Sequence, residues 1–343
     1  MTFSTSSNLE VRELGVNEFA SWDELVHKSP HGTIFHSSFW LTACSRALGK
    51  TLKIYGCFRN GRLIAGCSLF VLGSRRADST IRMTPYGGYV MAPLETGSVR
   101  RQEDANAIIV GCLTQTLLEQ GFLSLSMSNP PGYIDVRPFL WTGWDVKVYY
   151  TYYFDLEGEL EERVSKEVRW AARKAVKNNI KVSMLEKPDV SKYDALFSMT
   201  FARKALTQPA PSGFLQEMFR AVAYEGAGEM WVAETPNGDL ASAEVILRDS
   251  RRAYRWSAAS HTDYRDTGAT SLLLCEILKD LQKRKFKEID LMAANTPVLA
   301  KFVASFNPQL VPFYRVEHKE RKTRLTKIRE SIHRLVARTL SES

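Results

Sequence analysis

Several motifs that mark common classes of enzyme are missing from this sequence. It has no G-x-S-x-G, the turn that exposes the serine of many hydrolases, and no H-E-x-x-H, the helical zinc-binding pair of many metalloproteases. It also has no complete phosphate-binding G-x-x-x-x-G-K-[ST] loop. We therefore expect no hydrolase serine, no metal site and no nucleotide hydrolysis.

Long apolar runs and paired cysteines are missing too. No stretch reaches the roughly eighteen apolar residues that a membrane-spanning helix needs. Residues 1–8 have neither the basic nor the apolar region of a signal peptide. The five cysteines include no C-x-x-C pair, and their number is odd. We expect a cytoplasmic protein with reduced, mostly buried thiols and no membrane span.

Positive charge is in excess, with a net charge of +8 over 343 residues, and much of it lies in two segments. One is a helix predicted over residues 160–179. The other is a helix predicted over 318–343, whose apolar residues repeat at helical spacing. We expect this second helix to pack on the protein by its apolar stripe. Its basic face fits tRNA, DNA or anionic lipid, unless it is simply solvated.

The chain has two halves with a similar order of elements. Each half contains helices, a hairpin, a further strand, a long helix and a last strand, and the hairpin turns are Asn60-Gly61 and Asn237-Gly238. We expect an α/β (α+β) protein with two tandem domains, residues 1–148 and 149–317. Their sheets should be mixed and mostly antiparallel, with a cleft between the domains. The helix over 318–343 would pack on the first domain. A single continuous sheet would rule out two domains with separate sheets.

A glycine turn joins the strand predicted at 253–260 to a long helix in the second half. Gly268 lets the backbone come close to a ligand, Arg265 adds positive charge, and Ala269 and Thr270 begin the helix. The first amides of a helix have no partner within it and attract an anionic phosphate. This turn is our candidate cofactor-binding site. The alternative is an ordinary helix start.

Four segments, in this order, resemble the FemABX-like branch of the GNAT acyltransferase superfamily. They are residues 35–40 (FHSSFW), 169–182 (RWAARKAVKNNIKV), 200–203 (TFAR) and 301–308 (KFVASFNP). The resemblance covers nearly the whole chain and implies tandem GNAT domains. It also implies transfer of an acyl or aminoacyl group to an amine. The donor would be acyl-CoA or aminoacyl-tRNA, acting as a co-substrate and not as a tightly bound cofactor.

The sequence departs from the family pattern in three places. The lysine of the family's Phe-Lys pair is Val303 here, and Lys301 lies two residues away. No heptad run predicts the coiled-coil arm of the tRNA-binding peptidyltransferases. The acetyl-CoA pattern of single-domain GNAT enzymes is met only in part, because residues 265–270 (RDTGAT) end in threonine. The resemblance therefore supports the fold more strongly than it supports either donor.

The basic helix and its neighbours are our candidates for binding substrate. Arg169 and Arg173 lie four residues apart and so share a helix face, and arginine matches the geometry of a phosphate or carboxylate. Arg203, Lys301 and Phe302 complete the set of substrate-binding candidates. The alternative for the basic helix is a solvated face.

Acyl transfer to an amine needs a base for the proton and hydrogen-bond donors for the oxyanion. By resemblance, a backbone amide on a strand that splays from its neighbour holds the oxyanion. Glu244 is the first candidate base, because burial in an apolar strand would raise its pKa. The alternative is that Glu244 faces solvent or pairs with Arg255. Asp290 is a second candidate base, and Tyr314 a candidate proton donor to the leaving group unless it only packs.

Two other functions fit the same residues. The chain is then either a tRNA-associated protein that binds through its basic helices without catalysis, or a degenerate scaffold in which Val303 marks lost catalysis. For a transferase, both a small-molecule amine and a peptide amine fit as acceptor.

Overall fold

The computed structural model describes residues 9–93, 97–203, 207–211 and 213–319. The helix predicted over 318–343 lies outside the described residues, except that His318 and Lys319 belong to a strand. Within the described part of the chain, no helix has both the length and the hydropathy needed to cross a bilayer.

One thirteen-stranded sheet runs through the whole molecule, in the order β1-β2-β3-β4-β6-β13-β7-β12-β11-β10-β9-β8, with β5 paired to β3. The first half supplies β1 (Leu9–Glu13), β2 (Thr51–Arg59), β3 (Arg62–Gly73), β4 (Arg76–Asp78), β5 (Tyr89–Met91), β6 (Ser124–Ser128) and β7 (Asp145–Asp155). The second half supplies β8 (Lys181–Met184), β9 (Gly228–Glu234), β10 (Leu240–Arg248), β11 (Ala253–Ser260), β12 (Glu288–Asp290) and β13 (Gln309–Lys319). The pairs β4–β6 and β11–β12 are parallel and the others antiparallel, as the predicted mixed sheet requires.

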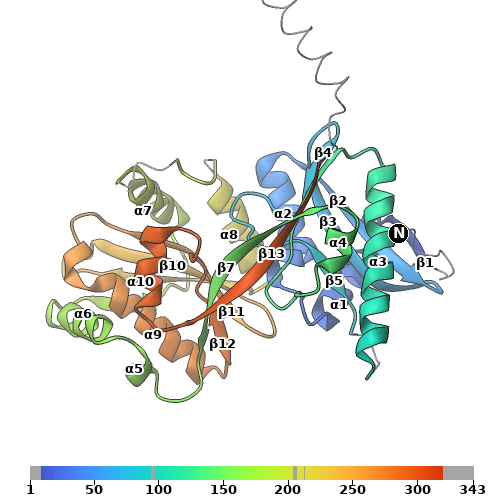
Figure 1. Cartoon of the computed structure of the whole chain (residues 1–343). Coiled ribbons are helices and arrows are strands. Elements are labelled where there is room, and N and C mark those ends of the chain that lie inside the picture. The colour runs from blue at the N-terminus through green and yellow to red at the C-terminus, as the bar shows by residue number, and fades with distance from the viewer. Residues whose placement is uncertain (1–8, 94–96, 204–206, 212, 320–343) are drawn as a thin grey trace, which may run out of the picture.

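Each half of the chain gives its last strand to the sheet of the other half. β13 pairs with β6 of the first half, and β7 pairs with β12 of the second. β7 and β13 also pair with each other, and Figure 1 shows them as two long arrows that cross the middle of the molecule. The strand order therefore follows the same pattern from either end, which supports a duplicated unit.

The continuous sheet corrects one part of our expectation. We expected the halves to keep separate sheets, whereas the exchange of β7 and β13 joins them by hydrogen bonds. This exchange pairs residues that are far apart in the sequence, so local patterns do not reveal it. The fold class, α/β with tandem units, is confirmed. The predicted boundary between residues 148 and 149 falls inside β7.

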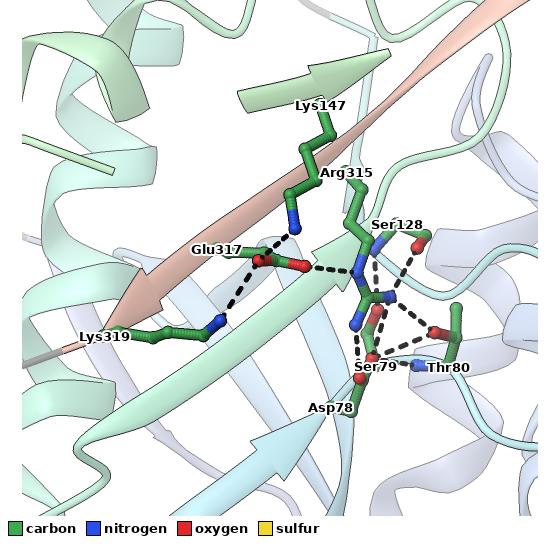
Figure 2. A network of polar contacts seen from close by, with 8 residues as sticks. All are labelled: Asp78, Ser79, Thr80, Ser128, Lys147, Arg315, Glu317 and Lys319. Atoms are coloured by element: carbon green, nitrogen blue, oxygen red, sulfur yellow. Dashed lines mark hydrogen bonds and ion pairs between the residues drawn. The ribbon is translucent and has the colours of Figure 1, made fainter. Parts of the chain in front are cut away.

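An ion network holds β13 in the sheet of the first half (Figure 2). Arg315 of β13 donates a hydrogen bond to the hydroxyl of Ser128 on β6 at 2.9 Å and pairs with the buried Asp78 on β4. Glu317 accepts hydrogen bonds from Arg315 at 3.0 Å and from Lys147 on β7 at 2.8 Å. The exchanged strand is thus fixed by side chains as well as by its backbone.

Helices cover the sheet in three groups. The first group is α1 (Phe19–Lys28), α2 (Ser38–Leu48), α7 (Val190–Arg203) and α8 (Phe214–Tyr224), which share one apolar core drawn from both halves. The second is α3 (Val99–Glu119) and α4 (Arg137–Trp141), over the first half. The third is α5 (Leu160–Arg163), α6 (Lys166–Lys177), α9 (Ala269–Lys283) and α10 (Pro297–Ala304), over the second half. The two halves are therefore joined by a common core.

The basic helix predicted over 160–179 is two helices, α5 and α6. Ser165 separates them, because its side chain accepts a hydrogen bond from the backbone N–H of Val168 and so caps α6. Val168 and Ala175 are buried on one face of α6. The opposite face, which carries most of the basic residues, is directed outward.

Candidate active site

A pocket opens where β11 and β12 separate. These two strands pair in parallel at Ala253–Ile289 and Tyr254–Asp290 and diverge beyond them. A cavity of about 950 Å³ occupies the gap. One wall comes from α6, α9 and α10, and the opposite wall comes from α7 and the loop around Thr84 of the first half. Because these helix groups belong to different apolar cores, residues from both faces of the sheet line the pocket.

The pocket surface is largely apolar. Its larger apolar residues are Met83, Pro85, Trp170, Phe197, Phe201, Pro209, Trp256, Leu291, Met292, Val298, Leu299 and Phe302. Among the described lining residues, the charged ones are Lys174, Arg255, Arg265 and Asp266. An apolar lining with a few placed polar groups is typical of a site for a small ligand.

Gly268 brings the N-terminus of α9 to the pocket. Its φ of 84° is in the left-handed region, and a Cβ there would lie 2.0 Å from the carbonyl oxygen of Ala171 in α6. Glycine therefore allows α6 and α9 to meet. Gly268, Thr270 and Arg265 line the pocket, and Ala269 is buried beside them. This end combines a guanidinium group with the positive end of a helix dipole, which attracts phosphate.

The edge of β11 that faces the pocket presents backbone groups. The hydroxyl oxygen of Thr200, on α7, accepts a hydrogen bond from the Ser260 N–H at 3.0 Å and lies 3.1 Å from the Ser260 carbonyl oxygen. Backbone groups alternate in direction along a strand, so those of Ala258 face the same side as those of Ser260. Ala258 lines the pocket. Its amide is therefore our candidate donor to an oxyanion.

Glu244 lies next to this wall and pairs with Arg255. The Glu244 carboxylate is fully buried and accepts hydrogen bonds from the Arg255 guanidinium at 2.7 and 2.6 Å. Arg255 lines the pocket, and its guanidinium carbon lies 5.7 Å from the centre of the Phe302 ring. This is the cross-strand pair that the sequence offered as the alternative to a base. The role of Glu244 as a base stays a prediction beside this observed ion pair.

Asp290 ends β12 one residue before the pocket wall at Leu291. Its buried carboxylate accepts hydrogen bonds from the Tyr86 hydroxyl at 2.7 Å, from the Met292 N–H at 2.9 Å and from the Thr151 hydroxyl. Burial raises the pKa of Asp290. A raised pKa suits a general base, so Asp290 stays our candidate. The structural alternative is that these bonds only join the two halves, because Tyr86 belongs to the first.

The face of α6 that lines the pocket is not the one that we selected from the sequence. Trp170 and Lys174 line the pocket. Arg169 instead donates hydrogen bonds to two backbone carbonyl oxygens, at 2.9 and 2.6 Å. Arg173 borders a separate groove between α6 and α9. Successive residues of a helix differ in direction by about 100°, so our choice was one position away from the lining face.

Of the remaining residues that the sequence singled out, some line the pocket and others do not. Phe302 lines the pocket, whereas Lys301 is exposed on α10 and does not line it. Val303, at the family's lysine position, is fully buried in the core beneath α10. Tyr314 packs against the core of the first half, so its predicted role as proton donor has no support in this geometry. Arg203 ends α7, and its side chain lies outside the described part of the structure.

The equivalent gap in the first half is closed by hydrogen bonds. Beyond β4, the Ser79 N–H donates to the carbonyl oxygen of Ser126 at 2.9 Å, and the Gly87 N–H donates to that of Ser128 at 3.0 Å. The Ser79 hydroxyl also accepts a hydrogen bond from the Ser128 N–H at 3.0 Å. The segment after β4 therefore fills the position that the pocket occupies in the second half. Only its residues around Thr84 reach the pocket itself.

Residues 163–298 match the family described as acetyltransferase (GNAT) domain. No match is found among curated proteins. Among solved structures, FemX is similar with a TM-score of 0.66 and 12% identity, over 89% of this chain and 96% of FemX. A tandem GNAT protein from the clavulanic acid biosynthesis pathway has a TM-score of 0.58 and 12% identity, over 92% and 99% of the two chains. L-PGS from Bacillus licheniformis has a TM-score of 0.58 and 11% identity, over 92% and 95%.

The family match places a GNAT acetyltransferase domain in the second half of the chain. The matched residues 163–298 run from the end of α5 to the start of α10 and include β11, Gly268 and Asp290. Over nearly its whole length the chain has a fold similar to that of FemX and the other two structures.

Sequence reasoning missed part of the pocket. The loop around Thr84 carries no motif, and it reaches the pocket only because the two halves share a core. Thr200 lay within a segment that we quoted for the resemblance, but nothing in its sequence context shows that it bonds to Ser260. Trp170 and Lys174 were detectable in principle, since they lie on one face of the basic helix that we had singled out.

Proposed function

We propose that this protein transfers an acyl group from a phosphate-bearing thioester, an acyl-CoA, to an amine. The observation that carries the proposal is the pocket between the diverging strands β11 and β12. It joins the N-terminus of α9 to the backbone edge of β11, and it has walls on both sides of the sheet.

The donor binds on the side of α6 and α9. Its phosphates meet the first-turn amides after Gly268, with Arg265 and Lys174 as the nearby cations. The acyl end then lies along β11, with its carbonyl oxygen at the amide of Ala258. A single donor of this kind is worth about 10²–10³ in rate when it is aimed at the oxyanion.

The acceptor enters from the side of α7 and the first half. Its nitrogen attacks the thioester carbonyl, a C–N bond forms, the C–S bond breaks and the sulfur leaves as a thiolate. The amine loses a proton in the process, and we propose Asp290 as the group that receives it. The acceptor wall contains Met83, Pro85, Phe197 and Phe201, which favour an amine attached to an apolar or aromatic group.

A binding panel tests this function. CoA, acetyl-CoA, a longer acyl-CoA and an aminoacylated tRNA are each added to the protein, and its thermal unfolding is followed. We expect the CoA compounds to stabilise it, by about 2.7 kcal/mol at a hundredfold excess over Kd. Stabilisation by aminoacyl-tRNA alone would indicate that aminoacyl-tRNA, and not acyl-CoA, is the donor. Stabilisation by none of these compounds would favour a degenerate scaffold.

Two lysines of α6 give a matched comparison within this panel. Lys174 lines the pocket, whereas Lys177, on the same helix, borders the groove on its other side. We expect Lys174→Ala to weaken binding of acetyl-CoA and Lys177→Ala to leave it unchanged. Equal effects of the two substitutions would mean that α6 attracts anions in general. The proposed donor site in this pocket would then be wrong. Activity is then tested with a panel of amines, by release of free thiol.

A further inference from the structure

The outward face of α6 has an exposed tryptophan surrounded by cations. Trp170 is 64% exposed. Lys166 and Lys174 lie four residues before and after it, and Arg173 and Lys177 lie three and seven residues after it, so all four share its side of the helix. Val168 and Ala175 are buried on the opposite side. Trp170 and these four cations therefore belong to the exposed face of α6 and not to the core.

These cations have no salt-bridge partner in the described part of the chain. None of the four forms a salt bridge with a carboxylate of the described residues, whereas Lys279 on the neighbouring α9 pairs with Glu276 at 3.2 Å. The Lys174 ammonium lies 5.4 Å from the centre of the Trp170 ring. Positive charge without internal partners favours an anionic ligand from outside.

Exposed aliphatic side chains accompany this cluster. Val176, also on α6, is 60% exposed, and Val298 on α10, a pocket residue, is 71% exposed. Trp170 and Lys174 line the pocket as well, so the basic face continues into the apolar cavity. Figure 1 shows α6 at the outer end of the second half, far from the first half.

We propose that the outward face of α6 docks on the surface of an anionic lipid bilayer. Lysine and arginine side chains are attracted to acidic headgroups, and tryptophan has its preferred position at the level of the headgroups. The exposed valines and the apolar pocket favour a bilayer over a nucleic acid, because aliphatic side chains gain little from phosphates or bases. Docking places the mouth of the pocket against the membrane, where an amphipathic acyl donor or acceptor enters it.

Sedimentation with lipid vesicles tests this surface. The full chain is mixed with vesicles of phosphatidylglycerol and phosphatidylcholine, or of phosphatidylcholine alone, and the bound fraction is measured. We expect binding to the anionic vesicles only, weakened by added salt. Each basic residue at such a surface contributes about fivefold to the partition coefficient, so Arg173→Ala with Lys177→Ala should lower it about 25-fold.

Trp141 offers a matched control for Trp170. It is 54% exposed on α4 of the first half, and the neighbouring Arg137 is already paired with Asp135 and Glu103. Trp170→Ala should weaken vesicle binding, and Trp141→Ala should leave it unchanged.

Three results would overturn the proposal. They are equal effects of the two tryptophan substitutions, equal binding to both kinds of vesicle, and release of the protein from the vesicles by tRNA at a concentration below that of the lipid. The doubly substituted Arg173 and Lys177 protein should still be stabilised by acetyl-CoA, because neither residue lines the pocket. Loss of vesicle binding with intact donor binding would thus concern this surface alone and leave the proposed function in place.

Discussion

Replacing Gly268 by alanine should both destabilise the protein and abolish binding of the acyl donor. An L residue in the left-handed region costs about 1–2 kcal/mol. The new Cβ would also lie 2.0 Å from the backbone carbonyl oxygen of Ala171, so α6 or the start of α9 must move. Overpacking of this kind costs about another 1–3 kcal/mol. The expected loss is therefore about 2–5 kcal/mol.

Gly238 provides the control for this substitution. It has the same φ of 84°, in the turn between β9 and β10, but nothing lies within 4 Å of a Cβ built there. Gly238→Ala should therefore lose only the conformational part, about 1–2 kcal/mol, and should leave donor binding intact. The difference between the two variants isolates the contact between α6 and α9.

Urea unfolding of both variants, together with a titration of acetyl-CoA, measures these effects. Gly268→Ala should unfold at a lower urea concentration than Gly238→Ala and show no binding. If the two variants unfold at the same concentration and both bind the donor like the wild type, Gly268 does not join α6 to α9 and the phosphate end of the site is misplaced.

Further predictions concern the ion pair, the buried acid and the edge of β11. Arg255→Ala should cost about 3–5 kcal/mol in urea unfolding, because it leaves the buried Glu244 carboxylate without its partner; a loss under about 1 kcal/mol would mean that the pair is not buried. Burial raises the pKa of Asp290, so the folded state holds this proton more tightly than the unfolded state. The free energy of unfolding then falls as pH rises from about 4 through the raised value, and Asp290→Asn should remove that fall. A difference between wild type and Asp290→Asn that is the same at every pH would contradict the shift. Thr200→Val should lower kcat about tenfold or more at nearly unchanged donor affinity, because the backbone at Ser260 loses its support, and Thr200→Ser should restore it. A loss of affinity in place of kcat would place Thr200 in binding.

Local sequence patterns predicted much of the fold. The turns at Asn60-Gly61 and Asn237-Gly238 join β2 to β3 and β9 to β10, as their residues require. The long helix after Gly268 was also predicted, and α9 begins at Ala269. These features depend on neighbours in the sequence, which is why a pattern of a few residues determines them.

Features that depend on distant residues were not predicted. Nothing local distinguishes β7 and β13 from ordinary strands, because their exchange is set by partners in the other half of the chain. The choice of face on α6 failed for a related reason: charge alone singled out Arg169, although that side chain is held by backbone carbonyl oxygens. The pairing of Glu244 with Arg255 was foreseen only as an alternative, since the register of β10 and β11 decides it.

A crystal structure of the protein with bound CoA tests the central claim most directly. We predict that the pyrophosphate lies against the amides after Gly268 and that the thiol end reaches the edge of β11 at Ala258. Coenzyme bound on another face of the molecule, with the gap between β11 and β12 empty, would contradict it.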